Sequence, residues 1–227
     1  AAAKVRFDFY RDPNKDNQLD VITNSEVIEK YSNLLKSGSS EIYKLSAKST
    51  GFGSTTHVSV LDRDGNAASI TTTNGESCGH ILPNTGVILN NMLGEQDLNP
   101  LGFHKWEKTK RMPTLISPSL VINKMGDAKL VFGSAGSNRI RSAVIQVLSN
   151  YIFRNLSLKD SIYAPRLHLE NNTLHIEPGL TFDENSVSSS IEINNFTSLN
   201  LFFGGVNAVS PKEAVSDPRR GGCGISC

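Results

Sequence analysis

Two adjacent threonines, Thr55 and Thr56, follow a run of small residues and open a stretch in which apolar and polar residues alternate. A threonine hydroxyl is a weak nucleophile at neutral pH, so catalysis by it needs a base close by. When threonine is the first residue of a chain, its own α-amine, with a pKa of about 7.7 to 8, can be that base. Inside a chain this amine is part of an amide, so the Ser54–Thr55 bond would first have to break.

The hydroxyl of Thr55 could itself break that bond. It would attack the carbonyl carbon of Ser54, the acyl group would move from nitrogen to oxygen, and water would then release a new N-terminus. The small residues Gly51, Gly53 and Ser54 leave space for the attack. A threonine pair at the start of a strand is also typical of ordinary sheet structure, and the residue types leave Thr56 open as an alternative nucleophile.

The stretch that positions the threonines has the pattern of a β-hairpin. Val58, Val60 and Ile70 alternate with polar residues, and residues 64–66 have the Asp-Gly-Asn composition of a tight turn. We therefore predict two strands joined at this turn. His57 could act as a general base, but the alternation points it to the face opposite Thr56, and we assign it a structural role.

A second feature that could serve acyl transfer is the glycine-rich run at residues 133–137 (GSAGS), between a predicted strand and a predicted helix. Successive backbone N–H groups at the positive end of a helix can stabilise an oxyanion. Such a turn is otherwise a common packing feature, so it does not establish a catalytic site by itself.

Hydrophobic periodicity predicts the remaining elements. Thr23 and Glu26 form a capping box that starts a helix, Gly38 ends that helix, and residues 36–54 are expected to be a loop. Further strands are expected at residues 87–89, 120–122, 130–132, 174–176, 189–193, 199–203 and 206–209, and helices at 139–153 and 158–164. Residues 94–114 are expected to be a long irregular connection, which often lines a site. Periodicity alone therefore indicates an α+β fold.

Composition excludes several classes of function. The 227 residues are 38% apolar, enough to bury one ordinary core, and the net charge of +1 has no long block of one sign, so we expect no nucleic-acid partner. No apolar run approaches the roughly 20 residues of a membrane helix. The three cysteines, Cys78, Cys223 and Cys227, lack zinc-ligand spacing. Cys223 and Cys227 could pair in an oxidising compartment, but we expect free thiols. We expect no metal or organic cofactor.

The segment from Thr55 to Ala67 resembles the start of the small subunit of the γ-glutamyltransferases, also called γ-glutamyltranspeptidases. Five further stretches fit this family in the same order, at residues 86–92 (GVILNNM), 117–120 (SPSL), 133–140 (GSAGSNRI), 164–166 (APR) and 217–219 (DPR). Each motif is weak alone, but their shared order over residues 55–219 makes the resemblance specific.

The resemblance implies the four-layer αββα sandwich of the N-terminal nucleophile hydrolases, here partial. Residues 1–54 would be the C-terminal end of the large subunit with the linker to the cleavage site, and residues 55–227 the small, catalytic subunit. The rest of the large subunit would be missing from this chain, and cleavage would yield a heterodimer. The family's usual location is extracytoplasmic, although no secretory signal is visible at Ala1.

The resemblance also assigns catalytic roles. It selects Thr55 over Thr56 as the nucleophile, because Thr55 matches the family's first small-subunit residue. Thr73 matches a threonine that hydrogen-bonds the nucleophile, although it could equally be an ordinary strand residue. Gly136 and Ser137 match the two positions whose amides stabilise the oxyanion, and the second of these is usually glycine.

Substrate recognition departs most from the family pattern. Gly75 replaces an asparagine, Met92 a glutamine, Glu95 an aspartate, and Thr114-Leu115 a pair of serines. Glu95 could still pair with a substrate ammonium, Thr114 could donate to a carboxylate, and Asn74 could replace the lost asparagine. Met92 and Leu115 cannot do this.

These residues favour a γ-glutamyl transferase or hydrolase that cleaves itself before Thr55 and acts on γ-glutamyl amides such as glutathione. One alternative is a related acylase that acts on another amide, as cephalosporin-acylase-like members do. The other alternative is a scaffold of the same fold that never cleaves and has no activity.

Overall fold

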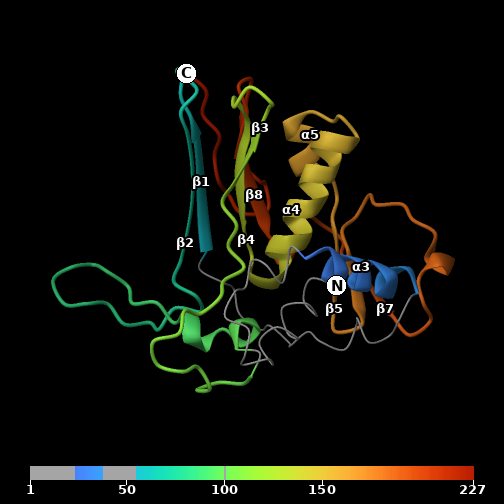
Figure 1. Cartoon of the computed structure of the whole chain (residues 1–227), viewed down its shortest axis with the longest axis horizontal. Helices are drawn as coiled ribbons and strands as arrows, with labels where there is room; N and C mark the ends of the chain where they lie inside the picture. Colours follow the sequence, from blue (N-terminus) through green and yellow to red (C-terminus); the bar gives the residue numbers. More distant parts are fainter. Residues whose placement is uncertain (1–23, 38–54, 100) are drawn as a thin grey trace.

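The computed structural model describes residues 24–37, 55–99 and 101–227 of the chain (Figure 1). Its mixed composition confirms the expected α+β class. The α-helices are α3 (Ser25–Lys36), α4 (Ile140–Leu148) and α5 (Leu158–Tyr163). The strands are β1 (Thr55–Leu61), β2 (Ala67–Thr73), β3 (Ser119–Ile122), β4 (Ala128–Ala135), β5 (Leu167–Glu170), β6 (Thr173–Ile176), β7 (Glu192–Asn195), β8 (Gly205–Val209) and β9 (Ala214–Val215).

The predicted hairpin is confirmed as β1 and β2, which pair antiparallel with Thr55 opposite Thr73. The Asp62 carboxylate closes the turn by accepting hydrogen bonds from the backbone N–H groups of Asp64, at 2.9 Å, and Asn66, at 2.8 Å. This local turn chemistry fixes the register that brings the two threonines together.

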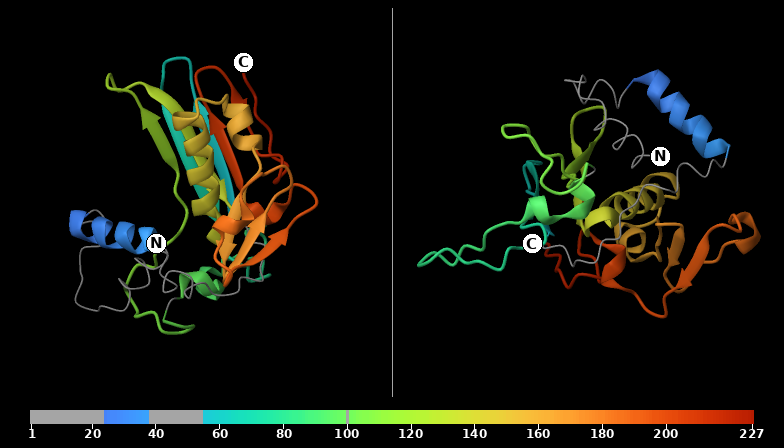
Figure 2. Two further views of the ribbon diagram at one scale, coloured as in Figure 1. Left: turned by 90° about the vertical axis from the view of Figure 1, so that its right-hand side faces the viewer. Right: turned by 90° about the horizontal axis from the view of Figure 1, so that it is seen from below.

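The hairpin lies against a four-stranded sheet of order β3-β4-β8-β9, and helices α4 and α5 cover the other face of that sheet (Figures 1 and 2). A cluster of buried side chains joins β4 and β8 to the two helices: Leu130, Phe132, Ala143, Val147, Leu158, Ile162, Val206 and Ala208. The described residues thus provide three successive layers, and β4, buried along most of its length, is at their centre.

The face of the hairpin that meets the sheet is polar. His57 is buried there, with its ring nitrogens 2.7 Å from the Thr71 hydroxyl and 2.8 Å from the Ser59 hydroxyl. Gly133 of β4 lies against the imidazole, and a side chain at Gly133 would overlap the ring. Ser69 donates a hydrogen bond to the Phe132 carbonyl at 2.9 Å. His57 therefore fills the space between the layers, in keeping with the structural role assigned to it.

Burial of His57 leads to a prediction about acid stability. Desolvation lowers the pKa of its imidazole from 6.5 to about 4, so the folded state holds the ring neutral. The unfolded chain binds a proton more readily between these two values, so stability from this group is complete above pH 6.5 and lost as the pH falls to 4. We expect the free energy of unfolding to fall by about 1–3 kcal/mol over this range from His57 alone.

Urea unfolding at pH 7.5, 5.5 and 4.5 measures this effect. His57→Gln should be less stable at pH 7.5 but should lose less stability on acidification. The carboxylates of the variant still titrate, but protonation of His57 no longer contributes to the pH dependence of the free energy of unfolding. Equal pH slopes in the two proteins would show that His57 is not held neutral by the fold.

The outer face of the hairpin exposes three branched apolar side chains. Val58, Val60 and Ile70 keep 53%, 50% and 62% of their surface accessible. In the part of the chain that the structure describes, Val58 and Val60 line an open hollow together with Cys223, Gly224 and Ile225. A row of this kind on one face of a sheet is typical of a surface that another segment covers.

A buried ion network ties the end of the chain to the centre of the fold. Asp217 pairs with Arg166 and Arg219, and Glu177 pairs with Arg219. The Asp217 carboxylate also accepts a hydrogen bond at 2.8 Å from the backbone N–H of Val206. The two short Pro-Arg motifs of the sequence therefore meet at the start of β8, where an uncompensated buried charge would be costly.

Several predicted elements need correction. Residues 87–89 do not form a strand. An isolated bridge pairs Ile88 with Ile81, and backbone hydrogen bonds join Val87 to Leu82 and Leu89 to His80, in a loop that projects from the molecule in Figure 1 and in the right view of Figure 2. Residues 199–203 are also not a strand. They contain a 3-10 turn (Leu201–Phe203) because the Asn200 side chain accepts a hydrogen bond from the Phe202 N–H at 2.9 Å.

The predicted ends of the first helix fall outside the described residues, and the boundaries of two other elements differ from expectation. Thr23 and Gly38, predicted to bound the first helix, lie outside the described residues, and the Asn24 side chain accepts the N–H of Glu26 at 2.8 Å at the start of α3. The predicted helix over 139–153 is α4 followed by a π-helical turn (Ser149–Phe153). The strand expected over 189–193 is shifted to β7, parallel to β6.

Candidate active site

Thr55 begins β1 and is buried, with 7% of its surface exposed. Its hydroxyl lies 3.0 Å from the Thr73 hydroxyl, which also accepts a hydrogen bond from the Gly75 N–H at 3.1 Å. Thr56 is exposed on the opposite face of the strand. Of the two candidate nucleophiles, Thr55 therefore faces the interior and has a neighbouring hydroxyl that orients it.

The sharp turn after β4 places Gly136 and Ser137 beside Thr55. Gly136 has a φ of +132°, and a Cβ on it would lie 2.6 Å from the Cα of Gly204. Ser137 has a φ of +52°, in the left-handed region that glycine adopts most readily. The positive φ explains why glycine suits position 137, the second of the two positions whose amides would stabilise the oxyanion. This chain accommodates serine there.

The 3-10 turn at Ser137–Arg139 leads directly into α4. The turn and helix therefore aim their N-terminal end, with its positive partial charge, toward the region of Thr55. The Ser137 hydroxyl donates to the Asp97 carboxylate at 3.3 Å, which ties this turn to the segment after β2.

Two 3-10 turns, Met92–Gly94 and Gln96–Leu98, bring Met92 and Glu95 to the site. The Asn99 side chain stabilises them by donating to the carbonyl oxygens of Leu93, at 2.9 Å, and Glu95, at 2.6 Å. Glu95 is 6% exposed. The predicted irregular connection is thus ordered by its own hydrogen bonds, and it places an acidic side chain opposite the nucleophile.

Gly75, which stands where the family has asparagine, cannot carry a side chain in this fold. Its φ is +61°, and a Cβ would lie 2.7 Å from the Asn91 carbonyl oxygen. Gly75 and Asn91 form a bridge that closes the base of the projecting loop. The close approach of Gly75 to Asn91 brings Met92 and Glu95 near β2.

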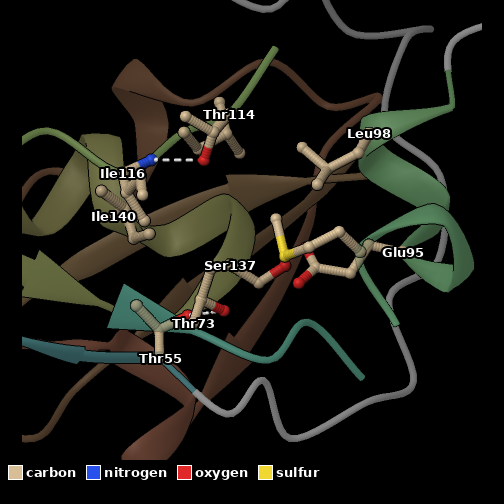
Figure 3. Close-up of a pocket in the computed structure, with 10 residues that line it drawn as sticks. Thr55, Thr73, Glu95, Leu98, Thr114, Ile116, Ser137 and Ile140 are labelled. Carbon is tan, nitrogen blue, oxygen red and sulfur yellow. Dashed lines mark hydrogen bonds between the residues drawn. The ribbon is translucent and has the colours of Figure 1, made fainter. Parts of the chain in front are cut away.

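Most of the predicted site residues line one pocket (Figure 3). Thr55, Thr73 and Ser137 lie together on one side, and Glu95 and Leu98 approach them from the other. The lining residues are Thr55, Thr73, Met92, Glu95, Leu98, Thr114, Leu115, Ile116, Ser137 and Ile140. Gly136 directly precedes Ser137. Asn74 does not line the pocket, and its backbone carbonyl accepts the N–H groups of Ser77 and Asn91.

Thr114 contributes a hydroxyl at the rim of the pocket. Its Oγ1 accepts the backbone N–H of Ile116 at 3.2 Å, which leaves its proton able to donate to a ligand. Leu115 and Met92 also line the pocket, and each offers only an apolar surface.

Sequence reasoning missed three apolar lining residues, Leu98, Ile116 and Ile140. Leu98 and Ile116 belong to irregular segments with no periodic pattern, so nothing in the sequence marks them. Ile140 could have been found, because it is the first apolar residue after the glycine-rich turn and begins α4.

Among the described residues there is no group of three or more His, Cys, Asp or Glu side chains able to hold a metal ion. Within the same residues, helices long and apolar enough to span a bilayer are absent. Cys78, Cys223 and Cys227 are exposed free thiols.

Comparison with known proteins identifies the family. A sequence model of the γ-glutamyltranspeptidases matches residues 2–227. The chain is 30% identical over 224 residues to the capsule biosynthesis protein CapD proenzyme of Bacillus anthracis, a match of 94% of this chain and 41% of CapD. It is 37% identical over 145 residues to the glutathione hydrolase 5 proenzyme of Rattus norvegicus, a match of 60% of this chain and 24% of the rat protein.

The chain thus spans less than half the length of these two relatives. Among solved structures, it is similar to a γ-glutamyltranspeptidase from Pseudomonas nitroreducens in complex with L-DON, with a TM-score of 0.61 and 27% identity. That match covers 76% of this chain and 99% of the solved one. The sequence motifs, the sandwich of two sheets and these similarities together show that the chain belongs to the γ-glutamyltranspeptidase family of N-terminal nucleophile hydrolases.

Proposed function

We propose that this chain carries the catalytic subunit of a γ-glutamyl transferase or hydrolase that cleaves its own Ser54–Thr55 bond. Thr55 then acts as the N-terminal nucleophile on γ-glutamyl amides such as glutathione. The observation that carries the proposal is the buried Thr55 hydroxyl, 3.0 Å from the Thr73 hydroxyl and in one pocket with Ser137.

The reaction follows from this geometry. The freed α-amine of Thr55 takes the proton of its own hydroxyl, and Oγ1 attacks the acyl carbon of the substrate amide. The backbone N–H groups of Gly136 and Ser137 stabilise the oxyanion that forms. The intermediate collapses to a threonine ester as the amine leaves with the proton. Water or an acceptor amine then attacks the ester, which restores the free hydroxyl.

The polar residues opposite Thr55 are suited to an amino-acid acyl group. Glu95 would pair with the substrate ammonium, and the Thr114 hydroxyl would donate to its carboxylate. Asn74, which does not line the pocket, has no supporting contact for the role expected of it. The named relatives include glutathione hydrolases, which favours γ-glutamyl substrates over the acylase and over the inactive scaffold.

We also propose that residues 1–54 end the large subunit, that residues 55–227 form the small one, and that cleavage yields a heterodimer. The solved relative is matched over nearly its whole chain by 76% of this one, and residues 55–227 make up the same share. A large-subunit segment outside this chain would cover the exposed apolar residues Val58, Val60 and Ile70 of the hairpin.

Two measurements on the full natural protein test the proposal. Intact-mass spectrometry after incubation should reveal a product that begins at Thr55. Hydrolysis should then be compared for three p-nitroanilides: the γ-glutamyl compound, the glutaryl compound, which lacks the ammonium, and the 4-aminobutyryl compound, which lacks the carboxylate. We expect clear preference for the γ-glutamyl compound. Faster hydrolysis of the glutaryl compound would instead support the acylase, and absence of cleavage in folded protein would support the scaffold.

A further inference from the structure

Arg220, near the end of the chain, touches the first residue of the proposed catalytic subunit. Its Nη1 donates a hydrogen bond to the backbone carbonyl oxygen of Thr55 at 3.3 Å. The contact joins residues 165 positions apart in the sequence. No step of the reaction described above uses this arginine.

Two features of the fold hold the Arg220 side chain in place. Its backbone N–H donates to the Asp217 carbonyl at 3.2 Å, and Asp217 is anchored in the buried ion network with Arg219. Its aliphatic stem lies on Gly205, where a Cβ would come within 2.8 Å of the Arg220 Cδ. Gly205 in turn pairs with Ala135, the last residue of β4 before the turn at Gly136. Arg220 therefore packs against the start of β8, which pairs with the end of β4 that leads into the turn at Gly136.

The guanidinium retains unused hydrogen-bonding capacity. Its Nε atom is buried and has no hydrogen-bond partner among the residues that the structure describes. Burial lowers the pKa of Arg220, the positive charge of Arg139 lowers it further, and Asp217 opposes this effect. An arginine side chain stays charged in proteins under ordinary conditions, so a partly buried positive charge is fixed beside Thr55.

We propose that Arg220 is a positioning residue for the nucleophile: its guanidinium holds the Thr55 carbonyl and places a fixed positive charge beside the amine that cleavage releases. This inference rests on the proposed role of Thr55. Anchoring limits rotation of the first residue of a strand, which would otherwise fray once the preceding bond is broken.

The positive charge of Arg220 affects the Thr55 α-amine, which acts as the base in the proposed reaction. A nearby positive charge favours the neutral form of an amine, so Arg220 should lower the pKa of the Thr55 α-amine and raise the fraction able to accept the hydroxyl proton at neutral pH. Among the described residues, the other charged groups around the site are Arg139 on the turn before α4, and Glu95 and Asp97 on the segment after β2. Of the four, Arg220 bonds directly to the backbone of Thr55.

The pH dependence of kcat/KM for the cleaved natural enzyme tests this role. Arg220→Met removes both charge and donor, Arg220→Gln keeps a donor without charge, and Arg220→Lys keeps the charge. We expect the acidic limb of the profile to move up by about half to one pH unit in Arg220→Met and Arg220→Gln. Activity on the acidic side of that limb should therefore fall about three- to tenfold. Arg220→Lys should return the limb toward its original position.

Arg63, on the exposed turn of the hairpin, provides a matched control. Arg63→Gln should leave the limb unchanged. A constant unfolded fraction does not move the limb, and because acidification destabilises the fold, each profile is fitted only over the pH range in which circular dichroism shows that variant to be folded. An unshifted limb in Arg220→Met, or equal shifts in the Lys and Met variants, would overturn the proposal. Absence of cleavage in the wild type would overturn the proposed function and this inference together, and is a distinct result.

Discussion

Replacing Thr55 by alanine should abolish cleavage of the Ser54–Thr55 bond and reduce hydrolysis of γ-glutamyl amides by at least about 10³-fold. The variant loses the attacking oxygen in both reactions, and without cleavage it also lacks the free amine that serves as base. The fold should survive, because the variant removes one side-chain hydrogen bond, to Thr73, which typically contributes about 0.5–1.5 kcal/mol. Intact-mass spectrometry and a γ-glutamyl anilide assay measure the two losses.

Two further variants show whether Thr55 or its neighbour Thr56 is the nucleophile. Thr55→Ser keeps a hydroxyl at the same place and should still cleave, although more slowly. Thr56→Ala changes the neighbouring threonine, which is exposed on the other face of β1, and should cleave and turn over at close to the original rates. If Thr56→Ala stopped cleavage while Thr55→Ala did not, the nucleophile would be Thr56 and the assignment above would be wrong.

Local signals in the sequence were sufficient for the central elements. The turn at residues 64–66 closes through contacts between residues two to four positions apart, so the hairpin and the pairing of Thr55 with Thr73 could be expected from the sequence. The apolar run in β4 and the glycine-rich turn before α4 are equally local. These features place Thr55, Thr73 and Ser137, which the structure brings into one pocket.

Features that depend on distant partners could not be predicted. The contact of Arg220 with Thr55 joins residues 165 positions apart. The network around Asp217 joins residues 51 and 42 positions apart. The predicted strand at residues 87–89 failed for the same reason. Its residues have strand-forming side chains, but they project in a loop without a neighbouring sheet, and an isolated strand pair is marginal in water.

The sequence also could not predict which face of the hairpin packs against the sheet. Alternation separates Val58 and Val60 from His57 and Ser59 but does not say which face is covered. The structure buries the polar face against β4 and leaves the apolar face exposed. The reason is that the sheet offers Gly133 and backbone acceptors at this contact, which suit an imidazole and hydroxyl groups better than branched aliphatic side chains.

Gly136→Ala should lower kcat by about 10²–10³-fold with little change in KM, because the amides of the turn contact the oxyanion only as it forms. The Cβ that alanine would add at Gly136 would lie only 2.6 Å from the Cα of Gly204, too close for two non-bonded carbon atoms. Both groups are backbone, so neither can swing aside. The turn itself must move, and with it the N–H groups of residues 136 and 137.

Gly126→Ala separates this displacement from the general cost of alanine at a positive φ. Gly126, in the turn between β3 and β4, has a φ of +93°, but a Cβ there meets nothing within 4 Å. Both variants should lose about 1–2 kcal/mol of stability from left-handed strain. Thermal unfolding followed by circular dichroism gives the folded fraction of each variant, and activity is then expressed per folded protein. On this basis only Gly136→Ala should lose activity. If both lost activity equally, the turn after β4 would be acting through stability rather than through its amides, and the proposed oxyanion site would have to lie elsewhere.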